Sequence, residues 1–426
     1  MATQSPFLSL PNELIVEIAV VTQNGDEENT KSELILSNVC RRFRHAVLGA
    51  PELWTKVEMD LTSEGSTNLS QLYLDRSTAR EIWVTLRALL AGDVLETKGL
   101  RQLTPHLARI SRLSVEADDS RNLDKLLVPF RNVAVPRLQH FEVVNQPYAG
   151  FRDPYQLPND LFSLGAPRVY SLSVSHCSTG APRQWMNSLT HVEFKESASL
   201  TNDSSEIFSD ITNQLPLLTH LNLDVSRSST TAGTGISSRR LTHLQLNCGD
   251  DFRAILDVIS CFDTPVLSTL TLCDCHGDQI SVLFSSDSPQ PSFPALKSLS
   301  CVKEEPETPP QCTDELEICR NYETIAAPPI RLFPRLSSWS LINQCFTARI
   351  LSETMGRNSQ PWPLLRTVTV WPMEADVDAV YDALREVVQW KRDSQEAVPK
   401  LRLSRSLFSR EYWAENGVDV ELVEGF

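Results

Sequence analysis

The 426-residue sequence lacks the excess of basic residues that phosphate-binding proteins carry. It has 39 Lys and Arg against 54 Asp and Glu, which gives a formal net charge of −15. Polyanions are held mainly through Lys and Arg, so this balance argues against nucleic acid or an anionic membrane surface as a partner. The N-terminus, MATQSPFLSL, has no basic start and no long apolar core, so no secretory signal is expected. No run approaches the roughly 20 apolar residues of a membrane span.

The sequence also lacks the short motifs of common enzymes and metal sites. It contains no GxxxxGKS/T, GxSxG, HExxH or GxGxxG stretch. Its ten cysteines form no CxxC pair, and we interpret them as reduced and mostly buried, which fits the cytoplasm or nucleus. The stretch CDCH at 273–276 has no second ligand pair at a useful distance. We therefore expect no catalytic residue, no metal and no cofactor.

A first amphipathic helix is predicted from Pro11 onward. Proline suits the first turn of a helix, because its missing N–H would be unpaired there. Leu14, Ile15 and Ile18 follow at helical spacing. The acidic, turn-rich stretch TQNGDEEN at 22–29 then ends the helix.

One second amphipathic helix is predicted to follow. Thr30 and Glu33 have the spacing of a capping box at its start. Gly49 and Pro51 mark its end, and Leu-Trp follows. The apolar residues between these ends recur at intervals of one to four residues, mostly three or four. They are Leu36, Val39, Cys40, Phe43 and Val47.

Four pieces of this region resemble the F-box, the helical module by which substrate receptors dock on the Skp adaptor of SCF-type ubiquitin ligases. The pieces are LPNEL at 10–14, Ile18, LSNVCRRFR at 36–44 and PELW at 51–54. Together they cover roughly residues 7 to 54. The resemblance implies that the adaptor is bound by Leu10, Pro11, Leu14, Ile15, Ile18, Leu36, Val39, Cys40, Phe43, Leu53 and Trp54.

The sequence departs from the F-box pattern at three places. Phe43 stands where the family often has Trp, Ala19 stands where a bulkier residue is common, and the loop at 22–31 is longer than usual. The alternative is a helical cap that buries its apolar face on its own chain.

An internal repeat covers the rest of the chain. Its starts lie 20 to 40 residues apart, in or near the range of about 20–29 residues typical of leucine-rich repeats. Each copy is predicted to be a strand with a return segment, and stacked copies share one core. The template apolar-x-x-apolar-x-apolar begins at Ile110, Leu138, Val169, Leu189, Leu218, Leu241, Leu267, Leu296, Leu336, Leu365 and Val398.

The pattern also extends backwards. IWVTLR places Val84 and Leu86 one period before Ile110's copy, and KVEM places Val57 and Met59 one period earlier. The first strands are therefore expected directly after the F-box-like region.

This part resembles the irregular leucine-rich-repeat domains of F-box proteins, especially the large fungal sets. It lacks the Asn or Cys ladder of regular leucine-rich repeats at most positions. The expected fold is α/β, with an F-box-like helical domain at 1–54 and a leucine-rich-repeat-like solenoid at 55–410, its parallel strands on the concave face. An acidic, Pro-rich insertion loop is expected at 302–333, and a C-terminal cap or tail at 411–426. The alternative is an ordinary α/β domain with many parallel strands.

Histidines recur at one template position. Those on three consecutive copies, His191, His220 and His243, are predicted to form a row, because neighbouring strands lie about 4.8 Å apart. His140 occupies the same position on an earlier copy. The row is interpreted as a solvent-facing position that favours polar rings, or else as a metal or pH-sensing site.

The residues between the template leucines are predicted to face the concave surface. Trp371 is the strongest candidate anchor there, because exposed aromatic side chains dominate binding energy when they fill a pocket; the alternative is a rim tryptophan packed on its neighbours. The candidate target-binding residues are Glu193, Lys195, His220, Asn222, Asp224, His243, Gln245 and Trp371.

The two resemblances imply a non-catalytic substrate receptor of an SCF-type cullin–RING E3 ubiquitin ligase. Its expected partners are a Skp adaptor, a cullin bound through that adaptor, and a protein target destined for ubiquitin-dependent degradation. The alternative is a repeat scaffold that binds the adaptor or other proteins without delivering ubiquitin.

Overall fold

The computed structural model divides the chain into two compact units, Met1–Leu189 and Thr190–Phe426. The structure describes residues 10–25, 31–89, 97–146, 155–179, 183–195, 215–224, 236–247, 259, 262–274, 293–302, 333, 335–342, 347–355, 364–372, 377–408 and 411–423.

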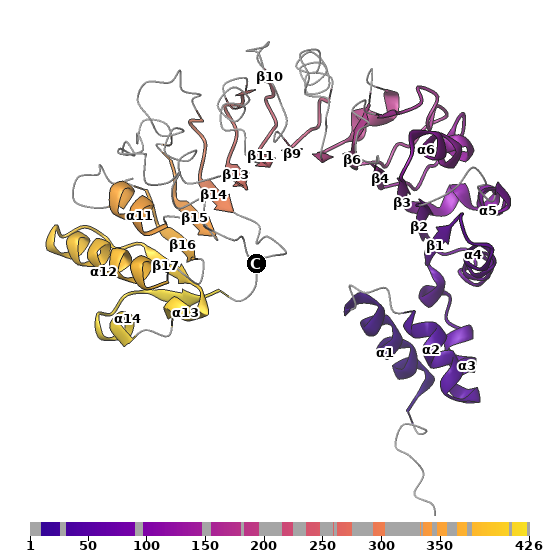
Figure 1. The fold of residues 1–426 in the computed structure, drawn as a ribbon, viewed down its shortest axis with the longest axis horizontal. Coiled ribbons are helices and arrows are strands. Elements are labelled where there is room, and N and C mark those ends of the chain that lie inside the picture. Colours follow the sequence, from indigo (N-terminus) through magenta and orange to yellow (C-terminus); the bar gives the residue numbers. More distant parts are fainter. Residues whose placement is uncertain are drawn as a thin grey trace, which may run out of the picture. The chain divides into compact units, whose positions relative to one another are not determined.

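The first unit begins with a group of short helices (Figure 1). These are α1 (Asn12–Gly25), α2 (Ser32–Val39), α3 (Arg41–Leu48) and the 3-10 helix η2 (Pro51–Trp54). The prediction of one second helix is wrong, because Cys40 is extended, with φ −159° and ψ 171°, and separates α2 from α3. The break turns Phe43, Ala46 and Val47 inward.

The predicted capping box is wrong as well. Helix α2 starts at Ser32, and the residue before it, Lys31, makes no side-chain capping hydrogen bond. Thr30 lies outside the described residues. Glu33 is instead buried and accepts hydrogen bonds from Gln23 and Tyr73.

The first unit continues with parallel strands and return helices. The strands are β1 (Lys56–Asp60), β2 (Ile82–Ala88), β3 (Ile110–Ala117), β4 (His140–Asn145) and β6 (Ser171–Ser175). Figure 1 shows α4 (Glu64–Arg76), α5 (Thr97–Leu103) and α6 (Ser120–Leu127) on one side of these strands. The short elements are η3 (Thr104–Arg109), η4 (Val128–Phe130), η5 (Gln184–Ser188) and the pair β5 (Tyr155–Gln156) with β7 (Cys177–Ser178).

The predicted register at the start of the sheet is confirmed. Val57 pairs with Val84, and Met59 pairs with Leu86. Val84 then pairs with Leu113 on β3. Side chains alternate between two faces along a strand, so this register places the template residues of β1, β2 and β3 on the buried face.

The second unit repeats the same strand along most of its length. Its strands are β8 (His191–Lys195), β9 (His220–Asp224), β11 (His243–Asn247), β13 (Thr269–Cys273), β14 (Ser298–Val302), β15 (Ser338–Ile342), β16 (Thr367–Trp371), β17 (Lys400–Leu403) and β18 (Val420–Leu422). Helices α11 (Thr347–Met355) and α12 (Val377–Asp393) lie on one side of the last strands (Figure 1). The remaining elements are α13 (Arg405–Phe408), α14 (Glu411–Glu415) and the pair β10 (Ile236–Ser237) with β12 (Phe262–Asp263).

The strand order confirms an α/β chain with one large parallel sheet. The order is β1-β2-β3-β4-β6 in the first unit and β8-β9-β11-β13-β14-β15-β16-β17-β18 in the second. β18 was not predicted, because its segment lacks the template. Most of the expected insertion at 302–333 lies outside the described residues. None of the helices that the structure describes is both long enough and apolar enough to cross a membrane.

The cores consist of template side chains and a few aromatic rings. Leu138, Leu218 and Leu296, each the first residue of a copy, are fully buried. In the first unit, Phe141 and Trp185 contact each other edge to face with ring centroids 6.1 Å apart. The stacked copies thus bury leucines that no single copy could cover.

Candidate binding surfaces

The N-terminal helices expose an apolar surface. Leu14 and Ile18 on α1 are 49% and 46% exposed. We call the following residues the helix surface: Leu14, Ile18, Val21, Ile35 and Val39. Single exposed apolar residues are ordinary, but five on two adjoining helices form a patch of the kind that marks an interaction site.

Helix α1 has a second apolar face that packs on its own chain. Ile15 and Ala19 are fully buried, one residue from Leu14 and Ile18 respectively. Because a helix completes one turn every 3.6 residues, neighbouring residues point in different directions, and Ile15 and Ala19 face away from Leu14 and Ile18. Helix α1 therefore packs one apolar face against its own chain and exposes another apolar face to solvent.

The predicted adaptor-binding residues fall into three groups by exposure. Pro11, Leu14, Ile18 and Val39 are exposed, and Leu10, Leu36 and Cys40 are half-buried. Ile15, Phe43, Leu53 and Trp54 are buried. Sequence reasoning missed two exposed residues, Val21 and Ile35, although each stands three or four residues from a predicted one.

Trp54 joins the helices to the first strand–helix copy. Its indole N–H donates to the carbonyl of Val47 at 3.0 Å, and its ring meets Tyr73 edge to face at 5.0 Å. The guanidinium of Arg76 lies 4.5 Å from the Trp54 ring centroid. In this chain the PELW stretch is therefore part of the packing between η2 and α4.

We call the contact region between the N-terminal helices and α4 the joint, made of Gln23, Glu33, Trp54, Tyr73 and Arg76. Glu33 supplies its buried carboxyl group. Gln23 donates to it at 2.6 Å and also to the carbonyl of Leu53 at 3.0 Å, while Tyr73 donates to its other oxygen. Burial raises the pKa of Glu33, and the hydrogen bond from Gln23 acts in the opposite direction. The joint thus links α1, α2, η2 and α4 through one polar group.

The second unit confirms the predicted row of histidines. His220 pairs in register with His191 on one side and His243 on the other. The rings are stacked, with centroids 4.1 Å and 4.0 Å apart and interplanar angles of 11° and 10°. His140 lies elsewhere, on β4 of the first unit, where Tyr170 contacts it.

A ladder of threonines beneath the stack orients the rings. The hydroxyls of Thr219 and Thr242 each donate at 3.1 Å to the backbone carbonyl one strand earlier. Each hydroxyl also lies 2.9 Å from Nδ1 of the next residue, His220 or His243. Since the hydroxyl proton is already used, Nδ1 carries the proton and donates to the threonine oxygen.

Two rings of the stack, His191 and His220, have lowered pKa values and therefore favour the neutral form. Burial, followed by the charges of His191 and His243, lowers the pKa of His220 to about 4. Burial and the charge of His243 also lower the pKa of His191. A neutral ring with protonated Nδ1 has its acceptor at Nε2.

The structure brings most of the predicted target-binding residues together on β8, β9 and β11. Asn222 donates to Glu193 at 2.8 Å, and Lys195 forms a 3.2 Å ion pair with Glu193. Asp224 and Gln245 occupy outward positions on the same strands. Trp371 is separate and half-buried on β16.

A block of small hydroxyl side chains on β13 to β16 lies outside the predicted target-binding residues. They occupy the x positions of LSTLTL, LKSLSC, LSSWSL and LRTVTV, so the signal was present in the repeat alignment. The register places them in two rows of four, made of Thr269, Ser298, Ser338 and Thr367 and of Thr271, Ser300, Ser340 and Thr369. The block carries no charge and offers only hydroxyl groups.

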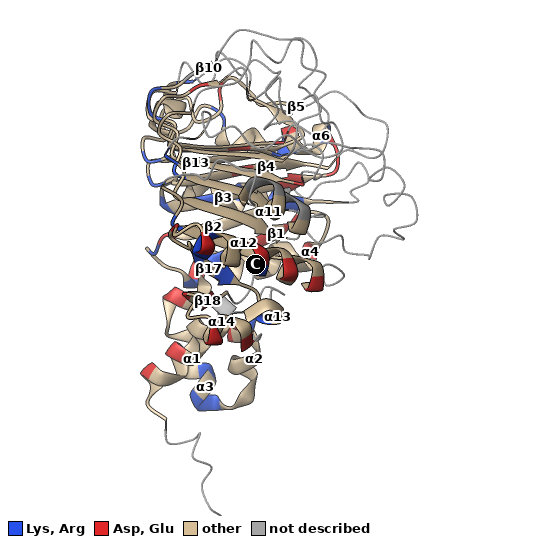
Figure 2. Cartoon of the chain, turned by 90° about the vertical axis from the view of Figure 1, so that its left-hand side faces the viewer, with Lys and Arg blue, Asp and Glu red and all other residues tan. Residues whose placement is uncertain are grey.

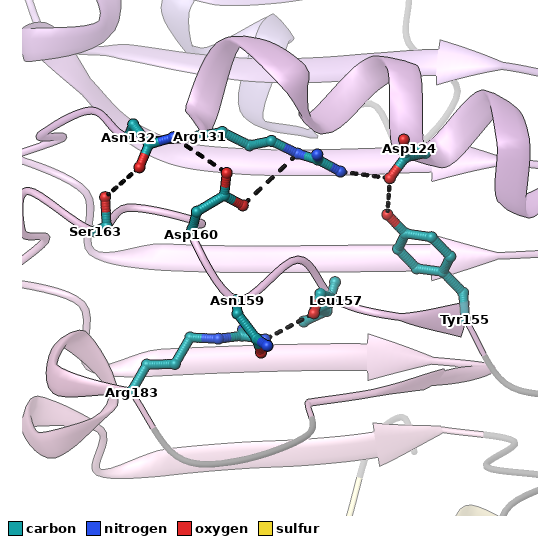
Figure 3. Close-up of polar contacts among 9 residues, drawn as sticks. All are labelled: Asp124, Arg131, Asn132, Tyr155, Leu157, Asn159, Asp160, Ser163 and Arg183. Atoms are coloured by element: carbon teal, nitrogen blue, oxygen red, sulfur yellow. Dashed lines mark hydrogen bonds and ion pairs between the residues drawn. The ribbon is translucent and has the colours of Figure 1, made fainter.

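Figure 3 shows a polar cluster in the first unit that ties return segments together. Arg131 forms ion pairs with Asp124 and Asp160, and Tyr155 donates to Asp124 at 3.0 Å. Arg183 donates to the carbonyl of Leu157 at 2.7 Å. Burial, followed by the hydrogen bond to Asp124, raises the pKa of Tyr155, so its hydroxyl stays protonated. These contacts connect the return segments, while Arg131 Nε, Arg183 Nε and Arg183 Nη1 have no hydrogen-bond partner among the described residues.

The described residues contain no cluster of side chains that could bind a metal ion. No group of three or more His, Cys, Asp or Glu in that part of the chain is arranged to hold an ion. In sequence comparisons, no protein family model matches the chain and no curated protein matches it.

Proposed function

We propose that this chain is the substrate-recognition subunit of an SCF-type cullin–RING E3 ubiquitin ligase. The N-terminal helices bind a Skp adaptor, which links the chain to a cullin, and the strand face holds a protein target. The chain itself is not catalytic, and it works in the cytoplasm or the nucleus.

The observation that carries this proposal is the division of α1 into two apolar faces. Ile15 and Ala19 are buried on the chain, whereas Leu14 and Ile18 stay about half exposed one residue away. A cap that served only its own fold would bury its apolar residues. An exposed apolar patch on the helices that resemble the F-box supports docking of a second protein there.

The packing around Trp54 and Glu33 supports a stiff connection between the docking helices and the first strands. The joint contains an edge-to-face aromatic pair, a cation–π contact and hydrogen bonds to a buried carboxyl. A receptor increases ubiquitin transfer by holding its target near the reacting groups, and that effect depends on positioning. A stiff joint serves this role better than a flexible linker.

A repeat scaffold that binds the adaptor without delivering ubiquitin is the alternative. The exposed helix surface supports it equally. Purification of the chain from cells separates the two, because a receptor recovers the cullin together with the adaptor, whereas a scaffold recovers the adaptor alone.

The docking assignment is tested by a double variant, Leu14→Asp with Val39→Asp. Both residues are exposed, so we expect the fold to persist while the charges abolish co-purification with a co-expressed Skp adaptor. Leu164→Asp is the matched control, because Leu164 is 71% exposed and lies outside the helix surface. Circular dichroism checks folding. Full retention of the adaptor by the double variant would show that these helices do not form the docking site.

A further inference from the structure

The strand face of the first unit carries an unusual row of cations around a tryptophan. Lys56, Trp83 and Arg112 are paired in register on β1, β2 and β3, so their side chains emerge side by side on the face away from the core. Trp83 is 42% exposed. Lys56 Nζ lies 5.5 Å and Arg112 Cζ 4.6 Å from the Trp83 ring centroid. The two cations therefore flank an accessible aromatic ring.

A second row of arginines runs beside the first. Arg80, Arg109, Arg137 and Arg168 each stand three residues before an outward strand residue, so they share one position of the repeat. Arg109 turns inward, but the other three are exposed. Figure 2 shows Lys and Arg gathered along this edge of the strands, near β2 and β3. We call the following residues the basic strip: Lys56, Arg80, Trp83, Arg112, Arg137 and Arg168.

Few carboxylates neutralise the basic strip. Arg137 lies 3.9 Å from Glu81, an exposed pair that contributes little. Arg80, Arg112 and Arg168 form no ion pair with any carboxylate that the structure describes. In a chain whose net charge is −15, four arginines with one carboxylate partner among the described residues make a local field of the opposite sign.

We propose that the basic strip binds an acidic segment of a protein partner, with an apolar side chain of that segment covering Trp83. Arg and Trp are the residues that most often dominate binding energy at protein interfaces. Complementary charge speeds encounter and selects the partner. This proposal rests on the proposed function in one respect, because it names the class of target that a receptor would hold on its strand face.

A nucleic acid fits the strip less well. The next outward row contains Glu58 and Glu142 on β1 and β4, which border the strip with negative charge. A nucleic acid strand would extend beyond the cations and meet this row and the acidic chain as a whole. A short acidic peptide needs only the strip itself.

The test uses the full chain and three fluorescent probes in polarisation assays. The probes are a short peptide of repeating Glu-Glu-Phe, the same peptide with Gln in place of Glu, and an oligothymidine strand. We expect the acidic peptide to bind in a salt-sensitive way, and the Gln peptide and the oligothymidine to bind at least about tenfold more weakly. Equal binding of the acidic and Gln peptides, tighter binding of the oligothymidine, or no binding of the acidic peptide would overturn the proposal.

Two variants connect binding to the strip. Trp83→Ala and Arg112→Glu should each weaken acidic-peptide binding by about tenfold. Arg121→Glu is the matched control, since Arg121 is exposed on return helix α6 of the same unit, and it should change binding less than about twofold. Equal losses in Arg112→Glu and Arg121→Glu, which change the net charge by the same amount, would show that binding follows net charge and would reject the strip. Adaptor co-purification of Arg112→Glu, measured on the same preparations, reports separately on the proposed function.

Discussion

The hydroxyl of Tyr73 on α4 donates a hydrogen bond to the buried carboxyl of Glu33 on α2. This contact joins the N-terminal helices to the first strand–helix copy, across 40 residues of sequence. Tyr73 also packs against Trp54, so the polar and aromatic contacts of the joint meet at one side chain.

Replacement of Tyr73 by Phe should loosen this joint. It removes the hydroxyl donor and leaves one oxygen of a buried carboxyl unpaired, which costs about 1–3 kcal/mol. The apparent urea unfolding midpoint should therefore fall. Tyr412→Phe is the matched control, because the buried Tyr412 hydroxyl has no hydrogen-bond partner among the described residues and its loss should cost nothing. Equal shifts in the two variants would rule out a stabilising Tyr73–Glu33 bond.

Glu33 should make the stability of the joint dependent on pH. Burial raises the pKa of Glu33 in the folded chain. The folded state therefore holds this proton more tightly than the unfolded state, where the pKa is about 4.3. The resulting stabilisation is fully present below that unfolded pKa and is lost as the pH rises through the folded pKa.

Glu33→Gln tests this dependence, because glutamine keeps the size of the side chain and does not titrate. We expect the stability of the native chain relative to Glu33→Gln to decrease as the pH rises from acid toward neutral. Urea unfolding over a pH series measures it. Parallel curves for the two proteins would mean that Glu33 has the same pKa folded and unfolded.

The strands could be predicted from the sequence because a strand has a period of two. One residue of slippage would expose every template leucine, so the pairing of Val57 with Val84 and the alignment of the histidines had only one workable register. The helix break at Cys40 could not be predicted in this way. Apolar residues at threes and fours fit one long helix or two short ones equally well.

The exposure of individual apolar residues was also beyond the sequence. Ile15 and Ile18 have the same chemistry and neighbouring places in one pattern, yet one is buried and the other is not. Trp54 and Trp83 differ in the same way, because the packing of α4 covers the first and the open strand face leaves the second exposed. Such differences arise from tertiary packing, which local spacing does not encode.

The histidine stack should make the second unit sensitive to acid. The pKa of His220 is lowered to about 4, chiefly by burial and then by its two neighbours, whereas an unfolded histidine titrates near about 6.5. The unfolded state therefore binds more protons between these values, and stability falls as the pH falls through this window. His220→Gln should lessen that loss and should leave the pH dependence above about 7 unchanged. Thermal unfolding over a pH series measures this difference. A parallel loss of stability in the native chain and in His220→Gln would contradict a role of the stack in acid sensitivity.

Arg109 is a buried cation that closes the end of a helix. It donates to the carbonyl of Leu74 at 2.7 Å, to the hydroxyl of Ser77 at 2.9 Å and to the carbonyl of Thr78, all at the C-terminus of α4. The last carbonyls of a helix have no partner within the helix, so the guanidinium supplies donors that the backbone lacks. Burial lowers the pKa of Arg109 without making it neutral at physiological pH.

Arg109→Met should therefore destabilise the first unit strongly. Methionine fills similar space but leaves several neutral acceptors unpaired, and each buried unpaired acceptor costs about 1–3 kcal/mol. Arg168→Met is the matched control, because Arg168 holds the same repeat position, is exposed and should change stability by no more than about 0.5 kcal/mol. Urea unfolding followed by circular dichroism compares the two. Similar midpoints would mean that water or a shifted backbone replaces the guanidinium, and that the inward arginine is dispensable for the fold.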